Sequence, residues 1–157
     1  TRALLRTHFP DYTNFVSTTQ IGTYWLSLIT LVHKGVATST ALRRLPDETF
    51  TGRLMTIVVP ETPRRAGFWL SNVHQDQASQ AAGQAGLLRV LGQRTGAAAR
   101  AGQYHLVLGD FNATSHDSDR RGYVGTSQTR SADDLFRTFL ASHLQRSPRT
   151  IRRSPAR

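Results

Sequence analysis

An aspartate and an asparagine follow a short apolar segment of the chain. Residues 104–108 (YHLVL) lead directly into Gly109, Asp110, Phe111 and Asn112. Layered α/β proteins place ligand sites at the carboxyl ends of strands, and Gly109 lets another group approach the backbone closely. If the chain stays extended there, the period of two places Asp110 and Asn112 on the same side. Such a pair can accept from and donate to a phosphate and its attacking water; the alternative is an ordinary turn, which Asp and Asn both favour.

A histidine ends a second predicted strand, residues 68–74 (FWLSNVH). His74 in that position can donate to a phosphate oxygen or act as an acid; the alternative is a surface or core histidine without a catalytic role. Asn72 lies two residues earlier. His105 lies within an apolar run, and we interpret it as structural.

The elements that must position these residues follow from the hydrophobic pattern. We predict extended segments at 14–18, 25–32, 53–59, 68–74 and 104–108, a helix from about 77 to 93, and a final helix with Ser131 as its N-cap. The segment at 25–32 is nearly continuous in apolar and β-branched residues, which predicts a strand buried on both faces. Glycines within 83–96 each cost about 1 kcal/mol in a helix, so we end the first helix at 93.

The order of these elements predicts a mixed α/β fold in layers. Short loops join the strands before residue 74, which favours antiparallel pairing. The first helix separates the last two strands and is therefore a crossover. This order differs from that of a Rossmann sheet, and the length of 157 residues suits one domain.

Charge is the largest departure from an average composition. Twenty cations oppose ten anions, and Lys34 is the only lysine, so the net charge of +10 is carried by arginine. A strongly basic domain is a candidate for nucleic-acid binding, and arginine suits bidentate phosphate contacts; the alternative is the codon usage of a GC-rich genome. The pairs Arg64-Arg65 and Arg120-Arg121 lie in predicted loops, and residues 146–157 form an Arg-rich tail without acidic residues.

Several classes of protein are excluded. Without Cys the chain has no disulfides, thiolate metal sites or cysteine nucleophile. No run approaches the ~20 apolar residues that a membrane helix needs, so we expect no membrane partner. The start at Thr1 shows neither an initiator Met nor a signal peptide, and we interpret the chain as the interior of a longer reading frame. We expect an intracellular location, nuclear or cytoplasmic.

The segment YHLVLGDFNAT (residues 104–114) resembles the most specific signature of the endonuclease/exonuclease/phosphatase superfamily, whose fold is that of pancreatic deoxyribonuclease and apurinic endonucleases. Upstream, WLSLITLVHKGV (25–36) resembles the family's GVAILVRKG strand. The segments GRLMTIVV (52–59) and FWLSNVH (68–74) resemble the strand pair before the family's helix. The resemblance covers about residues 9 to 144.

The resemblance implies a two-layer β-sandwich flanked by helices that hydrolyses phosphoester bonds with Mg²⁺ or Mn²⁺. By that similarity, Asp110 binds the metal and orients or deprotonates the attacking water, Asn112 hydrogen-bonds the scissile phosphate, and His74 contacts the phosphate. Mg²⁺ prefers oxygen ligands and polarises the phosphoryl group. Asn72, Arg120 and Arg121 are the candidates for substrate binding.

The chain also departs from the family pattern. The family's metal-binding Glu should precede the segment FPDY (residues 9–12), yet residues 1–8 contain no acid. Its C-terminal Asp-His pair has no counterpart after His143. We therefore expect residues 1–145 to be a partial domain, incomplete at both ends, with 146–157 as a basic tail. Because removing one member of a catalytic unit can abolish most activity, we expect little or no nuclease activity from this chain alone.

Several functions remain open from the sequence. The first is a metal-dependent DNA endonuclease domain, such as that of a non-LTR retrotransposon with a reverse transcriptase downstream. The second is a phosphatase or phosphodiesterase of the same fold that acts on small phosphoesters or phospholipid head groups. The third is a basic nucleic-acid binder without catalysis, and the fourth is a decayed gene fragment. The sequence does not specify an oligomeric state.

Overall fold

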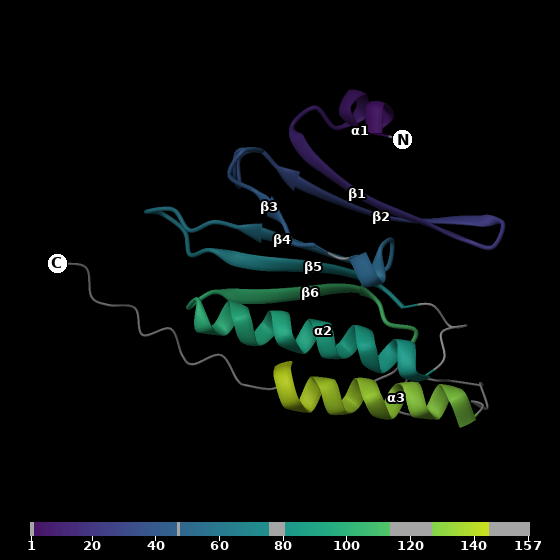
Figure 1. Cartoon of the computed structure of the whole chain (residues 1–157). Coiled ribbons are helices and arrows are strands. Elements are labelled where there is room, and N and C mark those ends of the chain that lie inside the picture. The colour runs from purple at the N-terminus through teal and green to yellow at the C-terminus, as the bar shows by residue number, and fades with distance from the viewer. Residues whose placement is uncertain (1, 47, 76–80, 114–126, 145–157) are drawn as a thin grey trace, which may run out of the picture.

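The computed structural model describes residues 2–46, 48–75, 81–113 and 127–144, which form a mixed α/β structure with two sheets and three α-helices (Figure 1). In chain order the elements are α1 (Arg2–His8), β1 (Tyr12–Ile21), β2 (Tyr24–His33), β3 (Arg43–Arg44), the 3-10 turn η1 (Glu48–Phe50), β4 (Leu54–Val59), β5 (Phe68–His74), α2 (Ala81–Arg100), β6 (Tyr104–Asp110), α3 (Ser127–Phe139) and the π-helical turn η3 (Leu140–Leu144). The predicted mixed α/β class is confirmed. No helix in the described ranges is long and apolar enough to cross a membrane.

The first two strands form an antiparallel hairpin that is longer than the sequence predicted. Tyr12 pairs with His33 at the open end and Ile21 with Tyr24 at the tip, where Gly22 has a φ of 59°. Alternate residues of β2 are buried, whereas the side chain of Trp25 is 68% exposed. The prediction that residues 25–32 are buried on both faces is wrong, because one face of this two-stranded sheet packs on the second sheet and the other carries exposed residues.

The second sheet has the strand order β3-β4-β5-β6. Strands β3, β4 and β5 pair antiparallel, and β6 pairs parallel with β5 through the α2 crossover, as the loop lengths predicted. All six residues of β4 are buried, because this strand lies inside the sheet with both of its faces covered. The predicted last strand extends two residues further, to Asp110.

Two apolar cores cover the two faces of this sheet. One lies between the hairpin and the sheet and contains Leu28, Val32, Leu42, Met55, Ile57 and Val59. The other lies between the sheet and the helices and contains Leu54, Val73, Leu87, Leu88, Leu91 and Phe139. Figure 1 shows the hairpin on one side of the sheet and α2 and α3 on the other. The cores hold β5 from both sides, whereas β6 packs on the helices through Val107 and exposes Leu106 and Leu108 on its other face.

Helix α2 continues to Arg100, so its predicted end at residue 93 is wrong. Glycines disfavour a helix by about 1 kcal/mol each, but here they allow close packing. A Cβ on Gly86 would meet the ring of Phe50 at 3.2 Å, and one on Gly92 would meet the ring of His143 at 2.7 Å. Burial of the leucine face and these close contacts offset the glycine cost.

Helix α3 begins at Ser127, four residues before the predicted N-cap Ser131, which lies inside the helix. The polar residues at 127–130 contain no Gly or Pro that would keep the helix from starting earlier, so the start of the helix is not fixed by Ser131. On the apolar face of this segment, Leu135, Phe136, Phe139 and Leu140 pack in the second core. The predicted tail at 146–157 lies outside the described residues.

Candidate functional site

The carboxyl ends of β5 and β6 lie side by side and carry His74 and Asp110. The parallel register pairs His74 with Asp110 and Val73 with Gly109. Paired residues of neighbouring strands project to the same face of a sheet. The imidazole and the carboxylate, which are 36 residues apart in sequence, therefore start from adjacent backbone positions on one face. Asp110 is exposed and His74 is half-buried.

Gly109 allows this close approach of the two strands. Its φ is 138°, a region that side chains rarely adopt. A Cβ at this position would lie 1.9 Å from the carbonyl oxygen of Val73. Gly109 was expected to let another group approach its backbone closely, and in the structure that group is the backbone of Val73 on β5.

A turn follows directly after Asp110. The backbone N–H of Asn112 donates to Oδ1 of Asp110 at 2.8 Å, and Asn112 has a φ of 47°. Asn and Asp tolerate this left-handed conformation better than other residues. The prediction that alternation places Asp110 and Asn112 on one side is wrong, because the strand ends at Asp110 and the chain turns.

The turn is tied to the end of β5 through Gln75. The N–H of Gln75 donates to the carbonyl of Asp110 at 2.8 Å, and Nδ2 of Asn112 donates to the carbonyl of Gln75. The N–H of His74 donates to the carbonyl of Arg53 at 2.8 Å, which ties in the start of β4. The carboxamide of Asn112 thus holds the backbone beside Asp110 instead of standing free next to its carboxylate.

Sequence reasoning missed Gln75. Its side chain is only 2% exposed, and its Oε1 has no hydrogen-bond partner among the described residues. A buried acceptor without a donor is costly. The only signal in the sequence is its place directly after the strand that ends at His74.

Asn72 serves the packing of the two sheets. Its Nδ2 donates to the carbonyl of Ile29 at 3.0 Å and to Oγ1 of Thr30 at 3.3 Å, both on β2. The carboxamide of Asn72 is therefore hydrogen-bonded to the hairpin, two residues before His74. The other two predicted substrate-binding residues, Arg120 and Arg121, lie outside the described residues.

A metal at this site would have one carboxylate ligand from the described residues. Those residues include no group of three or more His, Cys, Asp or Glu side chains that could hold a metal ion. Mg²⁺ commonly binds through one or two carboxylates and keeps several waters. The exposed carboxylate of Asp110 fits such a ligand, while its Oδ1 also accepts from the turn.

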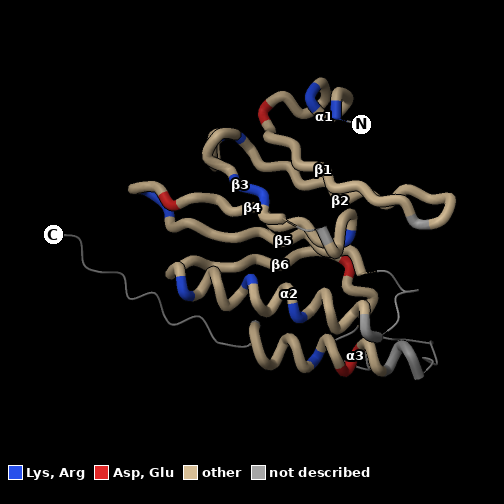
Figure 2. Tube along the Cα trace, in the orientation of Figure 1, with Lys and Arg blue, Asp and Glu red and all other residues tan. Residues whose placement is uncertain are grey.

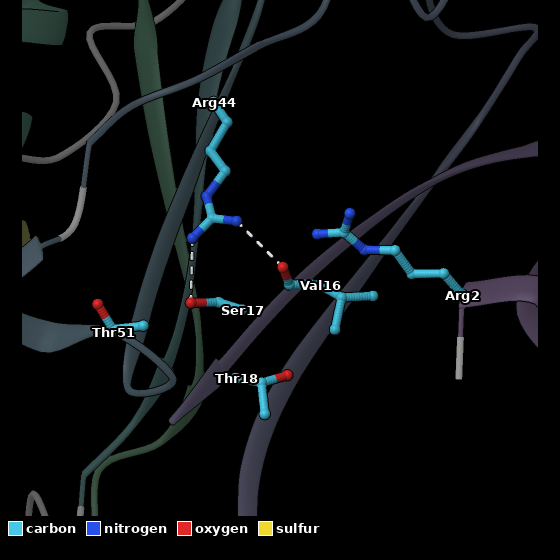
Figure 3. A pocket seen from close by; sticks show the side chains of 6 residues that line it. All are labelled: Arg2, Val16, Ser17, Thr18, Arg44 and Thr51. Carbon is cyan, nitrogen blue, oxygen red and sulfur yellow. Dashed lines mark hydrogen bonds between the residues drawn. The ribbon is translucent and has the colours of Figure 1, made fainter. Parts of the chain in front are cut away.

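A cavity of about 490 Å³ lies elsewhere, between α1, β1 and β3 (Figure 3). It is lined by Arg2, Val16, Ser17, Thr18, Arg44 and Thr51. The guanidinium of Arg44 donates to the carbonyl of Val16 and to Oγ of Ser17, both at 3.0 Å. These bonds join β3 to β1, and the cavity includes none of the residues that the sequence analysis selected.

The described arginines are distributed over several elements. Figure 2 shows cations on α1, on β3, in the loop between β4 and β5 and along α2. Arg53, next to β4, is the arginine whose carbonyl accepts from His74. In the loop pair Arg64-Arg65, the guanidinium carbon of Arg65 lies over the ring of Phe68, 5.4 Å from the ring centroid, and Arg64 is exposed.

Comparisons of the chain with protein-family models, with curated proteins and with solved structures returned no match.

Proposed function

We propose that this chain carries part of the catalytic site of a metal-dependent phosphodiester hydrolase, of the DNA endonuclease type within the endonuclease/exonuclease/phosphatase superfamily. The observation that supports the proposal most is the register of β5 and β6, which pairs His74 with Asp110. Further support comes from the Gly-Asp-Phe-Asn segment at the carboxyl end of β6 and from the net charge of +10. We also propose that the two packed sheets are the core of a deoxyribonuclease-like sandwich.

In this proposal each residue has a separate task. The carboxylate of Asp110 orients the attacking water and accepts its proton. His74 donates a hydrogen bond to a non-bridging phosphate oxygen. Asn112 acts as a positioning residue, because its backbone N–H holds Oδ1 of Asp110 and its side chain holds the carbonyl of Gln75. A bound Mg²⁺ would polarise the phosphoryl group and be held by Asp110.

Metal binding can be tested without activity. We expect Mn²⁺, added to the ¹⁵N-labelled chain, to broaden the amide signals around Asp110 and His74. D110N should remove this broadening. D134N is the matched control, because Asp134 is an exposed carboxylate on α3 that pairs with Arg137 at 3.7 Å. Broadening that persists in D110N would contradict the assignment.

Catalysis is tested by plasmid nicking with Mg²⁺. We expect the 157-residue chain to nick slowly or not at all. Robust nicking that D110A abolishes would support the hydrolase and overturn the expectation of an incomplete site. Hydrolysis of a soluble phosphoester, with no action on DNA, would instead select the small-molecule phosphatase.

A second candidate function is nucleic-acid binding without catalysis. The net charge of +10 favours it, because cationic side chains release counterions when they bind a phosphate backbone. Its signature is DNA binding that needs no metal and weakens steeply with salt, in both the wild-type chain and D110N. Absence of DNA binding at low salt would exclude this candidate.

A further inference from the structure

A chain of polar side chains runs through the interface between the sheet and α2. Arg94 donates from Nη1 to Oγ1 of Thr56 at 2.5 Å, and Oγ1 of Thr56 lies 2.5 Å from Oγ of Ser71. Oγ of Ser71 lies 2.8 Å from Nε2 of His105. Nδ1 of His105 lies 2.8 Å from Oγ1 of Thr95. The chain therefore joins β4, β5 and β6 to two positions on α2, the helix that Figure 1 shows beside the sheet.

The direction of every hydrogen bond in this chain follows from its two ends. At one end, the hydroxyl of Thr95 donates to the carbonyl of Leu91 at 3.0 Å, so Oγ1 of Thr95 can only accept from His105. The neutral imidazole then carries its proton on Nδ1, and Nε2 accepts from Ser71. At the other end, Arg94 is a fixed donor, so Thr56 accepts from Arg94 and donates to Ser71.

Protonation of Nε2 conflicts with this order. A protonated Nε2 must donate to Ser71, whose hydroxyl proton then loses its acceptor. Ser71 and Thr56 are both 0% exposed, so water does not replace the lost partner. A buried polar group without a partner is destabilising, and the new charge would face the cation of Arg94.

We propose that His105 is an acid-sensitive latch between α2 and strands β5 and β6: the neutral ring closes the hydrogen-bond chain, and protonation of Nε2 opens it. The surroundings of the ring support this proposal. Arg94 on α2 is the charged group that acts on it, while β5 contributes Ser71 and the edge of Trp69, whose ring centroid lies 6.4 Å away. Burial, and after it the charge of Arg94, lowers the pKa of His105 from 6.5 to about 4.

The latch lies beneath the candidate site and stands independently of the proposed function. His105 precedes Asp110 by five residues on β6, and Ser71 precedes His74 by three on β5. Opening the chain therefore loosens the helix from the two strands whose ends carry these side chains. From the sequence, His105 has only a structural role, and the latch adds a pH-dependent one.

The test is ¹⁵N NMR of the histidine-labelled chain with hydrogen exchange of α2. We expect the Nδ1–H tautomer of His105 at pH 7 and a pKa near 4. S71A should raise that pKa by about 0.7 pH unit, because it removes a bond to the neutral ring worth roughly 1 kcal/mol. Protection of the α2 amides, corrected for intrinsic rates, should fall on the order of tenfold between pH 6.5 and pH 4.

H105F should abolish this dependence, whereas H8Q should keep it, because His8 is exposed on α1. If H105F does not fold, the pKa of His105 in S71A decides the question. An Nε2–H tautomer, a pKa at or above 6.5, the same pKa in S71A, or unchanged pH dependence in H105F would overturn the proposal.

Discussion

Replacing Gly109 by alanine tests how the candidate site is built. Residue 109 has a φ of 138°, and a Cβ there would lie 1.9 Å from the carbonyl oxygen of Val73. The contacting atom belongs to the backbone of β5, so no rotamer change relieves the clash. To accommodate the methyl group, β6 must move away from β5 by about 1 Å.

The cost has two parts. The unfavourable φ contributes about 1–3 kcal/mol. Displacement of the strand leaves one or two ladder hydrogen bonds unmade, at roughly 1–3 kcal/mol each. We expect G109A to lower the free energy of unfolding by about 4 kcal/mol, a large share of the roughly 5–15 kcal/mol of a typical domain.

G102A is the matched control. Gly102 has a φ of 68°, but nothing lies within 4 Å of its added Cβ. The G102A variant therefore introduces a strained backbone conformation without a steric clash. We expect it to lower the free energy of unfolding by about 1 kcal/mol.

The assay is urea unfolding followed by circular dichroism. With an m-value of about 2 kcal/mol/M, G109A should lower the midpoint by about 2 M and G102A by about 0.5 M. Equal midpoints for the two variants would refute the close approach of β6 to β5. An intact G109A with displaced amide signals at Asp110 would show that the strands separate at low cost, which also contradicts the estimate.

Three further predictions follow from other contacts. N72A should lower the free energy of unfolding by about 1–2 kcal/mol in urea titration, because it removes two bonds between the sheets; no change would show that the sheets pack without them. G96A should raise stability by about 0.5–1 kcal/mol, while G92A should gain less because its methyl meets the His143 ring at 2.7 Å; equal thermal midpoints would contradict this. For His105, the pKa of about 4 lies below the unfolded value of 6.5, so the unfolded chain binds the proton first. Stability should therefore fall as the pH drops from 6.5 to 4, by about 1–2 kcal/mol for this partly solvated ring, and H105F should lack this component.

The sequence by itself determined the elements with strong local patterns. The apolar runs predicted strands close to the observed β2, β4, β5 and β6, and short loops against one long crossover predicted which pairs are antiparallel and which is parallel. Asp110 and His74 were identified as strand-end residues because each follows an apolar run. These signals are local, since side-chain alternation and loop length act over a few residues.

Tertiary structure alone decided the remaining features. The register that pairs His74 with Asp110 depends on α2 placing two distant strands side by side. The chain turns at Asn112 instead of staying extended, and bonds from Asn112 to Asp110 and to Gln75 hold this turn. Helix α2 continues through Gly86 and Gly92 because Phe50 and His143 occupy the space that a side chain there would need, and His105 obtains its hydrogen-bond partners from two other elements, β5 and α2. Hydrogen bonds and packing between residues far apart in sequence have no local signal, so only the folded chain determines them.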